Sequence, residues 1–108
     1  NSKKIQREKR FSILISAAKL KELTGEDIAE PIDENLILQG VIDCIFEEND
    51  RLVLVDFKTD KCKENELIDR YKVQIKLYNY ALKEITGKYP YKSYIYSFYL
   101  QKEIEIKE

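Results

Sequence analysis

Three charged residues stand inside two apolar stretches of this chain. Asp43 lies in the first stretch, which runs from Leu36 to Phe46, and Asp56 and Lys58 lie at the end of the second. Burying a charged side chain among apolar neighbours costs free energy unless the charge is paired or binds an ion. The pattern therefore indicates that these three residues have a chemical role.

The polar segment 47–51 fits the turn of a β-hairpin that joins the two stretches. If Asn49 and Asp50 form a two-residue turn, counting back along both strands places Asp43 opposite Asp56. The Cβ atoms of directly opposed residues lie roughly 4.5–5.5 Å apart. Alternation of side chains then puts Lys58 on the same face as Asp56. A four-residue loop would keep this register, whereas a three-residue or five-residue loop would break it.

Two facing carboxylates repel each other unless a cation lies between them. Their oxygen atoms suit Mg²⁺, with Mn²⁺ as a substitute, and such a cation can bind a phosphate group and lower the pKa of a bound water. A lysine two residues after the second acid can orient that water or stabilise the charge of the transition state. The trio predicts a metal-dependent site that cleaves phosphodiester bonds. The alternative is that Asp43 and Asp56 are ordinary strand-end residues and that Lys58 pairs with one of them.

Composition limits the other classes of function. The 108 residues favour a single domain over 1–108, and the 44% hydrophobic content is typical of a globular chain. The absence of histidine excludes His-based triads and His-ligated zinc within this chain, and no ATP-binding P-loop is present. Two cysteines suit a reducing, cytoplasmic location, and no apolar run is long enough to predict a membrane partner.

The net charge is −1, so a purely electrostatic hold on DNA should be weak. The chain also opens on a charged run without a start methionine. We therefore expect a fragment of a longer protein whose other parts hold the nucleic acid.

The apolar patterns predict the order strand, strand, strand, helix, strand, strand, an α/β or α+β layered fold. The expected strands are 11–16, 36–47, 51–58, 94–100 and 103–107, with a helical turn at 17–23, a loop at 26–35 and a main helix from 64 to 83 or slightly beyond. Both hairpin strands carry apolar residues on both faces, Ile42, Cys44 and Phe46 on one and Val41 and Ile45 on the other. They should therefore be central strands with helices over at least one face, and 103–107 should be a half-exposed edge.

The main helix carries two rows of residues. Its apolar row consists of Leu67, Tyr71, Ile75, Tyr78, Leu82 and Ile85. Arg70, Gln74 and Tyr78 recur at intervals of four and share a face that could contact DNA or order water. The alternative is that Arg70 and Gln74 are surface residues and that Tyr78 belongs to the core.

Three sequence blocks together resemble the RecB-like branch of the PD-(D/E)XK nucleases. They are Gly40-Val41-Ile42-Asp43, Val55-Asp56-Phe57-Lys58-Thr59-Asp60, and Arg70-Tyr71 leading to Gln74-Ile75-Lys76-Leu77-Tyr78. The resemblance spans nearly the whole chain and is strongest to the C-terminal nuclease domains of AddA-type subunits of bacterial helicase–nuclease complexes. It implies a restriction-endonuclease-like core, with a central mixed sheet flanked by helices.

The resemblance also implies roles for individual residues. Asp43 and Asp56 would ligate Mg²⁺, Lys58 would assist the attack by water, and Gln74 and Tyr78 would lie beside the site. Arg70 and Thr59 are the candidate DNA contacts. Family members usually carry a histidine on a helix upstream of the first strand, and this N-terminal helix of the core is expected to be missing here.

For the intact protein, the resemblance implies pairing with an AddB-like partner, unwinding driven by ATP in a helicase part outside this chain, and cleavage of single-stranded DNA during double-strand break repair and recombination. The fragment itself is expected to be monomeric. The alternative function is a nuclease-fold module that is non-catalytic as isolated and docks to a partner protein or to DNA.

Overall fold

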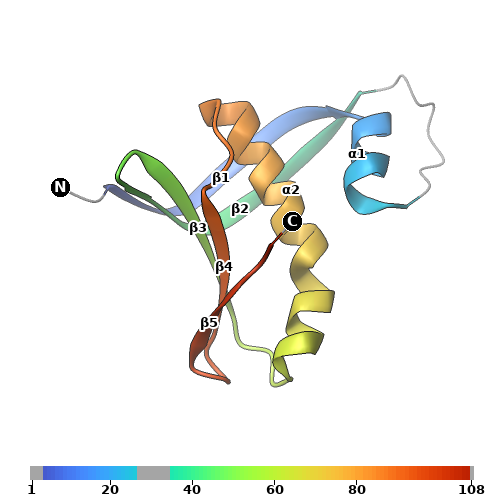
Figure 1. Cartoon of the computed structure of the whole chain (residues 1–108). Helices are drawn as coiled ribbons and strands as arrows, with labels where there is room; N and C mark the ends of the chain where they lie inside the picture. Colours follow the sequence, from blue (N-terminus) through green and yellow to red (C-terminus); the bar gives the residue numbers. More distant parts are fainter. Residues whose placement is uncertain (1–3, 27–34, 108) are drawn as a thin grey trace.

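The structure is a computed structural model that describes residues 4–26 and 35–107. Its elements are β1 (Lys4–Ser16), α1 (Ala17–Thr24), β2 (Asn35–Glu48), β3 (Arg51–Lys58), α2 (Glu64–Thr86), β4 (Lys92–Ser97) and β5 (Lys102–Glu105). The strands form one mixed sheet in the order β1-β2-β3-β4-β5, in which only β3 and β4 are parallel. Helix α2 runs along one face of this sheet (Figure 1). The α/β fold with a central mixed sheet is confirmed.

The β2–β3 hairpin has the turn that the sequence predicts. Asn49 and Asp50 both adopt positive φ angles, 54° and 62°, as a two-residue type I′ turn requires. Glu48 pairs with Arg51, and the register then continues to Cys44 opposite Val55. Asp43 and Asp56 are the next residues of the two strands, so the counting argument is confirmed.

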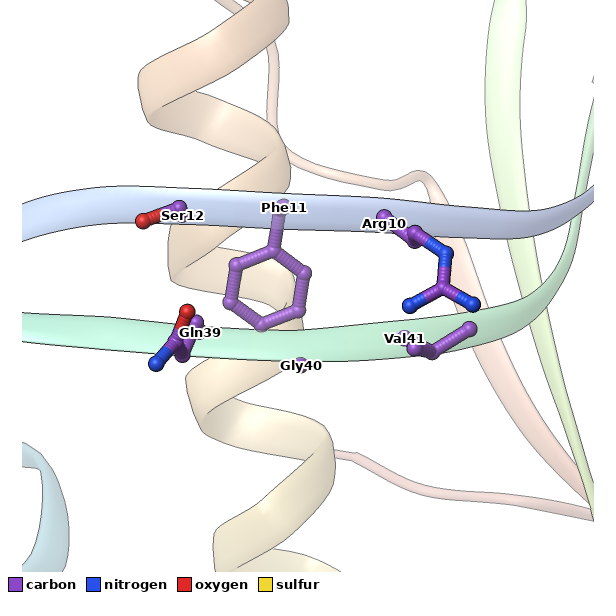
Figure 2. Close-up of a pocket in the computed structure, with 6 residues that line it drawn as sticks. All are labelled: Arg10, Phe11, Ser12, Gln39, Gly40 and Val41. Carbon is purple, nitrogen blue, oxygen red and sulfur yellow. The ribbon is translucent and has the colours of Figure 1, made fainter.

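The sheet forks immediately beyond that last pair. Strand β2 stops pairing with β3 at Cys44 but continues to pair with β1 from Ile42 to Asn35. The resulting β1–β2 ribbon crosses α2, where the ring of Phe11 lies 5.7 Å from that of Tyr78 in an edge-to-face contact. Figure 2 shows the Phe11 ring beside Gly40 with the helix behind it. The fork leaves Asp43 at the point where β2 separates from β3.

The alternation of side chains breaks at this fork. Ile42 and Ile45 both belong to the core that packs against α2, whereas Cys44 lies outside that cluster. The prediction that Ile42 and Cys44 share a face is therefore wrong. Asp43 and the facing position of β1, Glu8, form the one gap in the β1–β2 register, and Glu8 has a φ of 54°. A local kink of this kind turns the following side chains to the other face.

Helix α2 packs much as predicted. Leu67, Ile75 and Leu82 are buried in the core. Ile85 is 42% exposed, against prediction, because it lies in the last turn, where the helix is exposed from residue 84 onward. Gly87 ends the helix with a φ of 84° and donates its N–H to the carbonyl oxygen of Lys83.

Several boundaries differ from the predictions. Strand β1 begins at Lys4 rather than residue 11, because its pairing with β2 extends to Glu47. Strand β4 ends at Ser97, and Phe98 lies in the following turn with 52% of its surface exposed. The edge position of β5 and the short helix α1 are as predicted. Most of the loop predicted at 26–35 lies outside the described residues. Neither described helix is long and apolar enough to cross a membrane.

Candidate active site

The two aspartates lie on either side of the fork. Asp56 is near the end of β3, on the face that α2 covers, and only 2% of it is exposed. Asp43 is partly buried on β2, and its Oδ2 accepts a hydrogen bond of 2.9 Å from the backbone N–H of Phe57. The Asp43 carboxylate thus occupies the place where the β2–β3 ladder would have continued. It is thereby held beside Asp56.

The environment of Asp56 opposes its ionisation. Burial raises the pKa of this carboxyl to about 6, and a hydrogen bond with the Asp43 carboxyl raises it further, while Lys58 acts in the opposite direction. The two carboxyl groups are therefore close enough to share a proton. A pair of acids that retains a proton near pH 6 is the arrangement that a divalent cation can replace.

Lys58 completes the trio. Its Nζ lies 2.9 Å from Oδ2 of Asp56 and donates a 2.9 Å hydrogen bond to Oε1 of Gln74. The ion pair lacks hydrogen-bond geometry, so Oδ2 of Asp56 is buried without a hydrogen-bond partner among the described residues. A buried carboxylate oxygen without such a partner is unusual and indicates a ligand position.

The segment after Lys58 is fastened to the start of α2. Asp60 forms an ion pair of 2.6 Å with Arg70 and accepts a hydrogen bond of 2.9 Å from the hydroxyl of Tyr71. Arg70 accordingly lowers the pKa of Asp60, with a further contribution from Tyr71. The guanidinium of Arg70 is therefore already engaged by a carboxylate of its own chain.

Tyr78 lies between the core and the acids. Burial raises its pKa, with smaller contributions from the charges of Asp56 and Asp43. Its edge-to-face contact with Phe11 depends on Gly40, because a Cβ there would lie 3.1 Å from the Phe11 ring and 3.5 Å from that of Tyr78. The glycine of the G-x-x-D block is thus explained by the close approach of two aromatic rings.

The structure brings together five of the residues singled out in the sequence: Asp43, Asp56, Lys58, Gln74 and Tyr78. Thr59 is exposed beside them, and Arg70 is turned to Asp60. Two contacts of the site were missed. The Tyr71 ring lies 4.0 Å from Nζ of Lys58, and Asp60 holds the Tyr71 hydroxyl. Spacing along the helix assigned Tyr71 only to the apolar row, which conceals its contact with a residue of another element.

The donor set fits a small, hard cation. Within 4–26 and 35–107, no three side chains of His, Cys, Asp or Glu come together. The protein can therefore offer two carboxylates, which suits Mg²⁺ or Mn²⁺, ions that retain several waters and bind substrate oxygens. The partnerless oxygen of Asp56 supports that fit.

A family model described as the PD-(D/E)XK nuclease superfamily matches residues 2–108. The chain belongs to this superfamily. Its signature appears here as Asp43 and Asp56-Phe57-Lys58, with Ile42 in the place of the proline. These are the residues that converge at the fork.

Curated relatives of this PD-(D/E)XK chain are named as ATP-dependent helicase/nuclease subunits of the AddA type. The protein from Clostridium novyi (strain NT) is 42% identical over 106 residues, which are 95% of this chain. Those from Clostridium botulinum strains Loch Maree and Okra are 45% and 44% identical over 107 residues, or 98% of the chain. The matched region is 8% of each relative's length.

Proposed function

We propose that this chain is a Mg²⁺-dependent DNA nuclease domain that hydrolyses phosphodiester bonds of single-stranded DNA. One observation carries the proposal: buried Asp56 contacts the Asp43 carboxyl, keeps one oxygen without a hydrogen-bond partner, and lies beside the Lys58 ammonium. A purely structural ion pair needs only one acid. The second acid and the oxygen without a hydrogen-bond partner suit a cation that joins protein and phosphate.

In this proposal Asp43 and Asp56 hold Mg²⁺, or Mn²⁺ as a substitute. The bound cation supplies positive charge to the phosphate and lowers the pKa of water. Lys58 places a second positive charge where the attacked phosphate gains negative charge, and Gln74 holds the Lys58 ammonium in position. Tyr78 closes the apolar side of the site against water.

The names of the relatives support a setting for this activity. We infer that the domain acts within a larger ATP-dependent helicase–nuclease, where it cuts the strand that the helicase releases during double-strand break repair and recombination. ATP would serve only the helicase part. An AddB-like protein is the proposed partner, the isolated domain is proposed to be monomeric, and the proposed location is the cytoplasm.

The test uses the intact protein in its complex and measures cleavage of single-stranded DNA in Mg²⁺. Asp56→Ala and Lys58→Ala should abolish cleavage while DNA-stimulated ATP hydrolysis continues. The matched controls are Asp69→Ala and Lys72→Ala, which remove an exposed pair 3.5 Å apart on α2 and should cut normally. Normal cleavage by the Asp56 and Lys58 variants would refute the proposal.

A docking role is the second candidate, and an exposed aromatic group favours it. Phe57 and Phe98 are 37% and 52% exposed, their rings lie 5.8 Å apart, and Tyr96 lies 5.1 Å from Phe98. Calorimetric titration with Mn²⁺ discriminates between the two. Saturable binding that Asp43→Asn abolishes favours the nuclease, whereas the absence of binding favours a docking module.

A further inference from the structure

The ammonium of Lys58 is enclosed from three directions. Asp56 lies on one side and Gln74 on another, each 2.9 Å away. The third contact is the Tyr71 ring, whose centroid is 4.0 Å from Nζ, and the lysine side chain is only 16% exposed. An ammonium this close to an aromatic face is attracted by the negative charge of the ring's π system.

Tyr71 is itself fixed at its other end. Its hydroxyl donates a hydrogen bond to Asp60, and Asp60 is held in turn by Arg70. These contacts join the segment that follows β3 to the first turns of α2. The ring therefore has little freedom to turn away from the lysine.

We propose that Tyr71 is a positioning residue for Lys58, and that Asp60 and Arg70 act through it. This inference rests on the proposed nuclease function. The ring holds the ammonium at the Asp56 side of the site without forming a hydrogen bond to it, so a donor of the ammonium stays available for the phosphate. Arg70, which the sequence suggested as a DNA contact, acts here as an anchor within the protein.

The first test separates the ring from the hydroxyl in the intact complex. Tyr71→Leu removes the ring and should lower the single-turnover rate of single-stranded DNA cleavage about tenfold. The DNA concentration for half-maximal rate should stay unchanged, because bound DNA is not held by the ring. Tyr71→Phe keeps the ring and should retain most of the rate.

A matched control exists on the same helix. The Tyr80 ring lies 5.5 Å from Nζ of Lys19, a lysine–tyrosine contact away from the aspartates. Tyr80→Leu should leave cleavage unchanged. If Tyr71→Leu does not fold, Tyr71→Met offers a flexible apolar side chain of the same role in packing but without a ring face.

The second test needs neither metal nor substrate. Reductive methylation followed by mass spectrometry reports how accessible each lysine is in the metal-free complex. Tyr71→Leu should raise the labelling of Lys58 several-fold, while Tyr71→Phe should not, and labelling of Lys72 should be the same in all variants.

The outcomes distinguish this inference from the proposed function. If Lys58→Ala abolishes cleavage but Tyr71→Leu leaves both the rate and the labelling of Lys58 at wild-type levels, the positioning role is refuted and the nuclease stands. Equal losses in Tyr71→Phe and Tyr71→Leu would also refute a role for the ring. Normal cleavage by Lys58→Ala refutes the nuclease itself.

Discussion

The backbone N–H of Phe57 donates a 2.9 Å hydrogen bond to the Asp43 carboxylate, across the point where β2 leaves β3. A side chain here replaces the backbone partner that the sheet no longer provides. The same contact holds Asp43 beside Asp56. The fork in the sheet and the pair of acids are thus one structural feature.

Substitution of Asp43 should separate its charge from its hydrogen bond. Asp43→Asn keeps an oxygen that can accept from Phe57, whereas Asp43→Ala leaves that amide to solvent and should lower the free energy of unfolding by about 1 kcal/mol relative to Asn. Both should lose Mn²⁺ binding. Urea unfolding and calorimetry of the two variants check this, and Mn²⁺ binding by Asp43→Asn would contradict the metal site.

Acid pH should stabilise the metal-free domain at Asp56. Because the pKa of this group is raised from 3.8 to about 6 in the folded state, the folded chain binds the proton more tightly than the unfolded chain does. The stability that this proton provides is complete below about pH 4 and is lost as pH rises through about 6, a change of about 2–3 kcal/mol.

The measurement is thermal unfolding in EDTA between pH 4 and 7. Asp56→Asn stays neutral throughout, so the difference in melting temperature between it and the wild type should grow with pH in favour of the variant. Added Mn²⁺ at pH 7 should stabilise the wild type alone. A difference that does not change with pH would show that Asp56 ionises freely.

The acids and the lysine could be predicted because they depend on local rules. A turn at Asn49 and Asp50 and strict alternation fix Asp43 against Asp56 within one hairpin. The break in alternation at Asp43 could not be predicted, because it arises from the separation of β2 from β3 and from the positive φ of Glu8 on a third strand.

The supporting contacts of Lys58 illustrate a second limit. Gln74 was placed near the site by the resemblance, but its hydrogen bond to Lys58 joins a strand to a helix across 16 residues. Tyr71 and Asp60 meet in the same way. Periodicity places residues on a face of one element, but it does not state which residue of another element they meet.

Gly40 should tolerate no side chain. The Cβ of Gly40→Ala would lie 3.1 Å from the Phe11 ring, so the ring must shift, and we expect a loss of about 1–3 kcal/mol in unfolding free energy. Gly25 is a control for loss of a glycine away from the rings, since a Cβ there meets no atom within 4 Å, although its φ of 75° carries a separate backbone cost. Phe11→Leu combined with Gly40→Ala should recover part of the loss, and failure to do so would place the strain elsewhere.

Gln74 should matter through its oxygen rather than its bulk. Gln74→Leu fills a similar space but leaves Lys58 without its 2.9 Å acceptor, and we expect the cleavage rate of the intact complex to fall about tenfold with ATP hydrolysis unchanged. The matched control is Gln39→Leu, on the β1–β2 ribbon where Figure 2 shows Gln39 beside Ser12. Gln74→Glu keeps an oxygen for Lys58 and should cut faster than Gln74→Leu. If Gln74→Leu and Gln39→Leu cleave at the same rate, the ammonium needs no acceptor from α2, and Asp56 alone must direct it.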